Sequence, residues 1–215
     1  MGLISDKDKE TLRKELGNLK SDVKMLVFTS EDGCEYCKLV LEVATELQSL
    51  SERIKVERYE VSKNKEVAAK YGIDKTPALV LEAGNRRAVF YGVPAGYEFT
   101  TLVEDIVEIS EERPELYEKT REMLKQVDKD VHIMVFVTPT CPYCPAAVRI
   151  AHKFAFENPK IRAEMIEATE FRELAEKYGV FSVPKVVIND EVEFEGALPE
   201  EQFAEHVLLA IGKTI

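Results

Sequence analysis

The chain carries the same motif twice. Cys-Glu-Tyr-Cys at residues 34–37 is followed by Pro77, 43 residues after its first cysteine. Cys-Pro-Tyr-Cys at residues 141–144 is followed by Pro184 at the same spacing, and all four cysteines of the protein lie in these two pairs. An internal repeat with one dithiol and one distant proline in each copy predicts two copies of a dithiol–disulfide exchange unit.

The chain length and the local patterns agree with two consecutive units. A total of 215 residues suits two domains of about 100 residues each. In each copy, apolar periodicity and turn residues predict the element order α-β-α-β-α-β-β-α. The charged stretch at 111–114 ends in Pro114, which favours a helix start, and it marks the boundary. The predicted units are residues 1–112 and 113–215, which open with helices expected over 6–19 and 114–127.

Each dithiol is predicted to begin a helix, because the apolar residues that follow it recur at helical spacing. At such a terminus the unpaired backbone N–H groups and the helix dipole favour an anion, which lowers the pKa of a thiol. We therefore expect Cys34 and Cys141 to be the exposed nucleophiles. Cys37 and Cys144, one turn further along, are expected to resolve the mixed disulfide.

Two other uses of the cysteines have to be weighed. Two Cys-x-x-Cys pairs can hold one tetrahedral zinc ion. Here 104 residues separate Cys37 from Cys141, more than in a zinc ribbon, and each pair has its own proline. A purely structural disulfide within four residues closes almost no chain and so stabilises little. Redox chemistry is therefore favoured, and no metal site is expected.

With the prolines included, the chain resembles the thioredoxin superfamily. Cys-Pro-Tyr-Cys is typical of glutaredoxins, and Thr76-Pro77 and Val183-Pro184 resemble the cis-proline segment of that superfamily. The resemblance implies an α/β fold of two tandem thioredoxin-like units, each a central four-stranded mixed sheet flanked by helices. It also implies that Pro77 and Pro184 are cis and lie against the dithiols, where the backbone of Thr76 and Val183 pairs with a substrate chain.

The presence of two complete motifs resembles the protein disulfide oxidoreductases of hyperthermophilic archaea and bacteria, notably over residues 92–100 and 136–145. That family implies oxidation, reduction and isomerisation of protein disulfides in the cytosol. It also implies electrons from a flavoprotein of the thioredoxin-reductase type, and no organic cofactor bound to this chain. Two rival functions stay open: an electron donor to a peroxidase, and a metal-binding protein that uses its four thiols as ligands.

The chain departs from the superfamily in two respects. The strands expected over 23–28 and 131–137 contain no carboxylate, so the buried acid that relays protons in thioredoxins is absent from its usual strand. The general base for the two resolving thiols is therefore not identified. No Gly-Gly pair follows Pro184, which argues against glutathione as a dedicated substrate.

The two dithiols have different charged neighbours. Glu31, Asp32 and Glu35 surround Cys34, whereas no charge lies between the prolines on either side of the second motif. Nearby anions oppose a thiolate and raise its pKa. Cys141 is therefore predicted to be the more acidic thiol, and the second site the stronger oxidant.

Composition and charge exclude several classes of function. The net charge of −11 argues against nucleic acid and anionic membranes as partners. The first residues lack the basic start and apolar stretch of a secretory signal, so a cytoplasmic location is expected. A charged fraction of 32% with five Asn and three Gln is a hyperthermophile tendency. His132, His152 and His206 are expected at the surface or at strand ends, and the acidic run at 98–118 is expected to form exposed helix faces.

Overall fold

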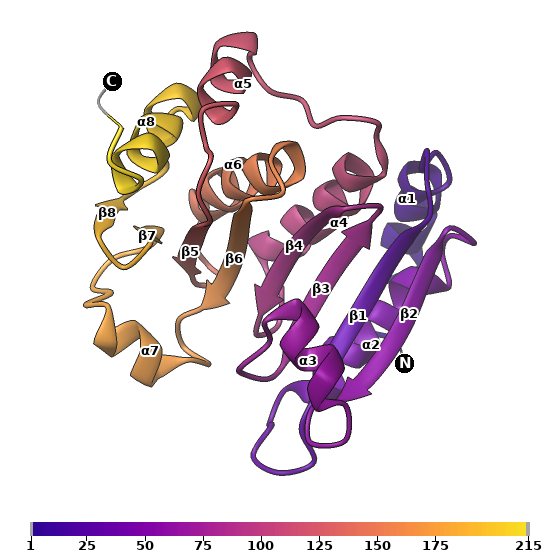
Figure 1. The fold of residues 1–215 in the computed structure, drawn as a ribbon. Helices are drawn as coiled ribbons and strands as arrows, with labels where there is room; N and C mark the ends of the chain where they lie inside the picture. Colours follow the sequence, from indigo (N-terminus) through magenta and orange to yellow (C-terminus); the bar gives the residue numbers. More distant parts are fainter. Residues whose placement is uncertain (1, 214–215) are drawn as a thin grey trace.

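The computed structural model describes residues 2–213, in which eight strands form one continuous sheet (Figure 1). The strand order is β2-β1-β3-β4-β6-β5-β7-β8, so each copy of the repeat contributes four neighbouring strands. Within each copy the pairing is mixed, with one parallel and two antiparallel neighbours. The expected α/β fold of two tandem units is confirmed. The strands are β1 (Val23–Thr29), β2 (Ile54–Glu60), β3 (Ala78–Ala83), β4 (Arg86–Tyr91), β5 (Val131–Val137), β6 (Ile161–Glu167), β7 (Lys185–Ile188) and β8 (Val192–Glu195).

Helices cover both faces of this sheet. One face packs against α3 and α7, and the larger hydrophobic core on the other face includes residues of the remaining helices (Figure 1). None of the helices within residues 2–213 is both long enough and apolar enough to cross a membrane. The helices are α1 (Asp6–Leu16), α2 (Cys37–Gln48), α3 (Lys65–Tyr71), α4 (Tyr97–Ser110), α5 (Glu118–Leu124), α6 (Cys144–Glu157), α7 (Arg172–Lys177) and α8 (Glu200–Ala210).

The central strands are buried on both faces, which explains why they read as continuous apolar runs. In β1, Met25 and Val27 enter the larger core, whereas Leu26 and Phe28 enter the smaller one, and all four are at most 1% exposed. Successive side chains of a strand point to opposite faces, so a strand covered on both sides needs apolar residues at every position.

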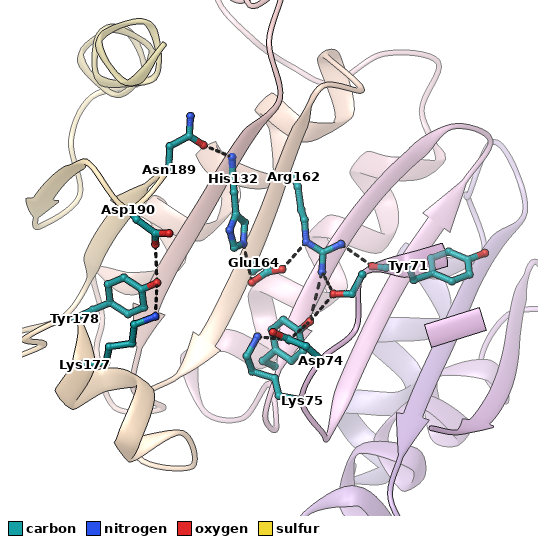
Figure 2. A network of polar contacts seen from close by, with 12 residues as sticks. Tyr71, Asp74, Lys75, His132, Arg162, Glu164, Lys177, Tyr178, Asn189 and Asp190 are labelled. Carbon is teal, nitrogen blue, oxygen red and sulfur yellow. Dashed lines mark hydrogen bonds and ion pairs between the residues drawn. The ribbon is translucent and has the colours of Figure 1, made fainter. Parts of the chain in front are cut away.

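The two units are joined edge to edge. Strand β4 of the first unit pairs in parallel with β6 of the second, with Tyr91 opposite Ile166. Figure 2 shows a polar network over this junction, in which the Arg162 guanidinium donates to the carbonyl oxygens of Tyr71 (2.6 Å) and Gly72 (3.0 Å). Glu164, which is 2% exposed, accepts from Arg162 at 2.5 Å. These bonds satisfy backbone groups at the end of α3 with a side chain of the other unit.

Two helix boundaries differ from the prediction. The first helix ends at Leu16, because the chain turns at Gly17, rather than continuing to residue 19. Helix α5 begins at Glu118 and not at Pro114. Pro114 instead lies in an irregular segment over 111–117, where its carbonyl oxygen accepts a hydrogen bond from the Arg121 guanidinium. A side chain of α5 therefore holds the segment that was expected to start the helix.

Candidate active site

Both dithiols lie on the same side of the sheet, where the parallel strands have their carboxyl ends. The first follows the carboxyl end of β1 and the second follows that of β5, and three strands lie between β1 and β5. Four strand spacings of about 4.8 Å place the two strand ends roughly 19 Å apart along the sheet. The four sulfurs therefore form two separate sites. Such a separation is incompatible with all four sulfurs coordinating one zinc ion, whose bonds to sulfur measure about 2.3 Å.

The first site contains a disulfide between Cys34 and Cys37, whose Cα atoms are 5.5 Å apart. Cys37 is the first residue of α2 and is 7% exposed, whereas Cys34 is half-buried in the preceding turn. The backbone N–H of Ser30 contacts Cys37 Sγ at 3.4 Å. Cys34 is thus the more accessible sulfur, as a nucleophile requires.

The second site contains a disulfide between Cys141 and Cys144, again with a Cα separation of 5.5 Å. The N–H of Cys144, at the first residue of α6, donates to Cys141 Sγ at 3.1 Å. A backbone donor at a helix N-terminus stabilises negative charge on that sulfur. Cys144 is 0% exposed and Cys141 is 7% exposed, so the outer sulfur is far less accessible than the sequence predicted.

The two prolines precede strands at the same edge. The Thr76–Pro77 and Val183–Pro184 peptide bonds are both cis, the geometry that the resemblance implies. Cys141 Sγ lies 3.7 Å from the carbonyl oxygen of Val183. In the first unit, the pairing of β1 with β3 places Pro77 opposite the end of β1, which leads directly into the first dithiol. Each predicted site therefore combines one dithiol with one cis-proline segment of the same unit.

Acidic groups from both units surround the first site. The charge of Glu35 raises the pKa of Tyr36, and Glu170 and Glu167 act in the same direction. Glu170 follows β6 of the second unit, and its Oε1 accepts from the N–H of Val93 at 2.8 Å. Burial, with the neighbouring charges of Glu167 and Glu35, raises the pKa of Glu170 to about 7. Sequence reasoning missed Glu170, because only the pairing of β4 with β6 brings it to this site.

A buried glutamate of the first unit lies in α4, the helix that packs against the helix of the second dithiol. Glu98, in α4, is 1% exposed, and neither of its carboxylate oxygens has a hydrogen-bond partner among the described residues. Burial raises its pKa to about 7. The prediction that the acidic run forms exposed helix faces is therefore wrong for Glu98, and also for Asp105, which is 0% exposed. A helical pattern cannot reveal that another helix covers the polar positions.

Helix α6 is the element that covers them. The Nδ1 atom of His152 lies 2.5 Å from Asp105 Oδ2, and Arg149 pairs with Glu104 at 2.8 Å. These pairs run in the same direction along both helices, so α4 and α6 are parallel. Asp105 and His152 are each the ninth residue of their helices, so Glu98, the second residue of α4, is level with the first turn of α6. His152 is 0% exposed and not a surface residue as predicted, because it pairs with Asp105.

Exposed side chains also distinguish the two sites. Tyr143, inside the second motif, is 71% exposed, and Phe181, two residues before Val183, is 96% exposed. Tyr36, the equivalent of Tyr143, is 36% exposed and lies among acidic groups. The second site therefore presents large apolar side chains, with Glu195 bound to Ser182 at its margin, whereas the first site is surrounded by acidic groups.

Comparison with known proteins agrees with this geometry. The family model described as "Thioredoxin domain" matches residues 23–104 and 131–209. The crystal structure of a protein disulfide oxidoreductase from Aeropyrum pernix K1 is 34% identical and superimposes with a TM-score of 0.90 over 98% of this chain and 95% of that one. The NTD_N/C domain of the alkylhydroperoxide reductase AhpF from Enterococcus faecalis is 25% identical, with a TM-score of 0.86 over 95% of this chain and 99% of that one.

A relative from Bacillus subtilis (strain 168), called NADH dehydrogenase, is 27% identical over 196 residues. The match covers 90% of this chain but 36% of that protein. This chain thus spans about a third of the length of these curated relatives.

Proposed function

The chain belongs to the thioredoxin-domain family, and from this premise we propose that it is a protein dithiol–disulfide oxidoreductase with two active sites. Its substrates are proteins that carry disulfides or dithiols. Residues 1–112 and 113–215 form the two units, with Cys34 and Cys141 as nucleophiles and Cys37 and Cys144 as resolving thiols. Thr76 and Val183, each followed by a proline, offer the backbone to which a substrate strand pairs.

The reduction of a substrate disulfide takes two exchange steps. The thiolate of Cys141 attacks one substrate sulfur, so that a mixed disulfide forms and the other substrate sulfur leaves as a thiolate that takes up a proton. Cys144 then loses its proton and attacks Cys141 Sγ, which releases the second substrate thiol. Two electrons pass to the substrate and the site ends as a disulfide. Oxidation of a substrate dithiol is the reverse sequence, and the first site runs the same steps with Cys34 and Cys37.

One contact carries the proposal most directly, the 3.7 Å approach of Cys141 Sγ to the carbonyl oxygen of Val183. It places the attacking sulfur beside a backbone acceptor, so a substrate strand bound there presents its disulfide to Cys141. The N–H of Cys144 donates a hydrogen bond to the same sulfur and so stabilises the Cys141 thiolate.

Glu98 supplies the proton acceptor that the central strands lack. Its carboxylate is buried at the level of the dithiol in the parallel helix α4, and both of its oxygens are without a hydrogen-bond partner among the described residues. A carboxyl group with a pKa of about 7 is suited to take a proton near neutral pH. In this role Glu98 accepts the Cys144 proton as Cys144 attacks the mixed disulfide.

The test is insulin reduction by dithiothreitol-primed protein. We expect turnover with the wild type, with Cys34→Ser/Cys37→Ser and with Cys141→Ser/Cys144→Ser, because each site acts independently. The variant with all four cysteines replaced should do no better than dithiothreitol alone. Equal turnover by that variant would refute the proposal. A four-thiol metal site would appear instead as stoichiometric zinc in protein purified without chelator.

A second role, as the electron-passing part of a peroxide-reducing system, is supported by the likeness to the alkylhydroperoxide reductase AhpF domain. In both roles a flavoprotein of the thioredoxin-reductase type reduces this chain. The relative called NADH dehydrogenase, of which this chain matches about a third, supports such a donor. Stopped-flow mixing of the reduced protein with an oxidised thiol peroxidase separates the two roles. Electron transfer faster than to insulin would favour the peroxidase role.

A further inference from the structure

Glu170 of the second unit reaches the substrate edge of the first. The pairing of β3 with β4 places Gly92 opposite Pro77, and the N–H of Gly92 donates to the Pro77 carbonyl oxygen at 3.1 Å. The next residue, Val93, donates its N–H to Glu170 Oε1 at 2.8 Å. Only Gly92 and Val93, the two residues that follow β4, therefore lie between the cis-proline of the first site and a carboxylate of the second unit.

Gly92 allows this close approach. A Cβ atom at Gly92 would lie 2.7 Å from Glu167 Cβ and 3.0 Å from Glu170 Oε2, so no side chain fits there. Glu170 is half-buried, and its Oε2 is buried without a hydrogen-bond partner among the described residues. A buried carboxylate oxygen that no donor satisfies is costly for structure alone. Its position therefore calls for a functional explanation.

The groups that face Glu170 come from three elements. Glu167 is the last residue of β6, Val93 follows β4, and Glu35 and Tyr36 lie inside the first dithiol motif. Both charged neighbours are anions, and Glu35 is the residue next to Cys34. The charge of Glu170 therefore acts on Glu35 and Tyr36, the two residues that follow Cys34 in the motif.

We infer that Glu170 is a positioning residue of the first dithiol. Through this residue the second unit favours the protonated form of the Cys34 thiol and makes the first site a stronger reductant. The inference rests on the proposed exchange at Cys34. An anion close to a thiol disfavours the thiolate, and a dithiol whose thiolate is less stable is a weaker oxidant. Each unit thus contributes one glutamate to the site of the other unit: Glu98 acts at the second site and Glu170 at the first.

The experiment isolates the first site in a Cys141→Ser/Cys144→Ser background and follows iodoacetamide alkylation of Cys34 against pH. In Glu170→Gln the apparent pKa of Cys34 should fall by about half a unit to one unit, because a nearby like charge is removed. Alkylation near pH 7.5 should then be roughly threefold to tenfold faster, and the two proteins should converge below pH 6, where Glu170 is neutral. The glutamine oxygen still accepts from Val93, so the turn is retained.

Two variants serve as controls. Glu173→Gln, on α7 of the same unit, removes the same charge from an exposed position and should leave the alkylation profile unchanged. Glu170→Asp keeps the charge and should keep most of the wild-type profile. An unchanged Cys34 pKa in Glu170→Gln, or an equal shift in Glu173→Gln, would overturn the inference. Absence of insulin reduction in the background protein itself would instead refute exchange at Cys34.

Discussion

His152 Nδ1 lies 2.5 Å from Asp105 Oδ2 across the junction between the two units, and both side chains are buried. Burial raises the pKa of Asp105, and the interaction with His152 opposes that effect. The pair is thus a contact on which both units depend, in the same interface of α4 and α6 that holds Glu98.

Replacing His152 with alanine should destabilise the protein by about 3–5 kcal/mol, because it leaves the buried Asp105 carboxyl group without its hydrogen-bond partner. Unfolding in guanidinium chloride, followed by circular dichroism, measures the loss. His206→Ala is the matched control, because this half-buried histidine on α8 lies outside the junction and should change stability by less than about 1 kcal/mol. A loss for His152→Ala no larger than that of the control would show that the pair contributes little.

Cys141 should be the more acidic of the two nucleophilic thiols. It receives a backbone N–H at 3.1 Å from the start of α6, whereas Cys34 lies among Glu35, Glu170 and other anions. Alkylation rates against pH, measured on Cys34→Ser and Cys141→Ser variants, give the two thiol pKa values separately. Equal pKa values would refute the asymmetry. They would mean that the burial of Cys141 raises its thiol pKa as much as the N–H of Cys144 lowers it.

Glu98→Gln should slow the second site, because it removes the proton acceptor for Cys144. In a Cys34→Ser/Cys37→Ser background, release of the second substrate thiol should be about 10-fold to 100-fold slower near pH 7.5. The wild-type rate should rise with pH through about 7, as the carboxyl group ionises, and the variant should lack that step. Attack by Cys141 on the substrate should be unaffected, so a variant that slows both steps equally would contradict the assignment.

The same residue gives a stability prediction of known sign. The pKa of Glu98 is raised to about 7 in the folded protein, above its ordinary value of 4.5. Between these values the folded state holds the proton more tightly than the unfolded state, so stability falls as pH rises through this window. Guanidinium unfolding at pH 5 and pH 8 should therefore show a smaller loss for Glu98→Gln than for the wild type. An equal loss in both would mean that the carboxyl group titrates normally.

The dithiols, the prolines and the division into two units could be predicted, because short motifs and a fixed repeat spacing encode them. Glu98, His152 and Glu170 could not be assigned, because their burial depends on the packing of α4 against α6 and on the pairing of β4 with β6. These contacts join the two units, and no local pattern encodes them. Pro114 failed as a helix start for a different reason, since a hydrogen bond from the Arg121 side chain of the same unit holds its segment outside the helix.

Gly96 provides a test of the junction itself. A Cβ atom there would overlap the carbonyl oxygen of Pro139, just before the second motif, and the N–H of Tyr97 donates to the same oxygen at 3.0 Å. Gly84 has nearly the same backbone angle, with φ of +62° against +60°, but a Cβ atom there meets nothing within 4 Å. Both alanine variants carry the strain of a positive φ, which is larger at Gly96 because its ψ of −126° lies outside the left-handed region, and only Gly96→Ala adds the overlap. We expect Gly96→Ala to cost roughly 2 kcal/mol more in guanidinium unfolding and to impair insulin reduction by the second site. If the two variants lost the same free energy of unfolding, the loop before Cys141 would be able to move away from residue 96, and the first unit would not fix its position.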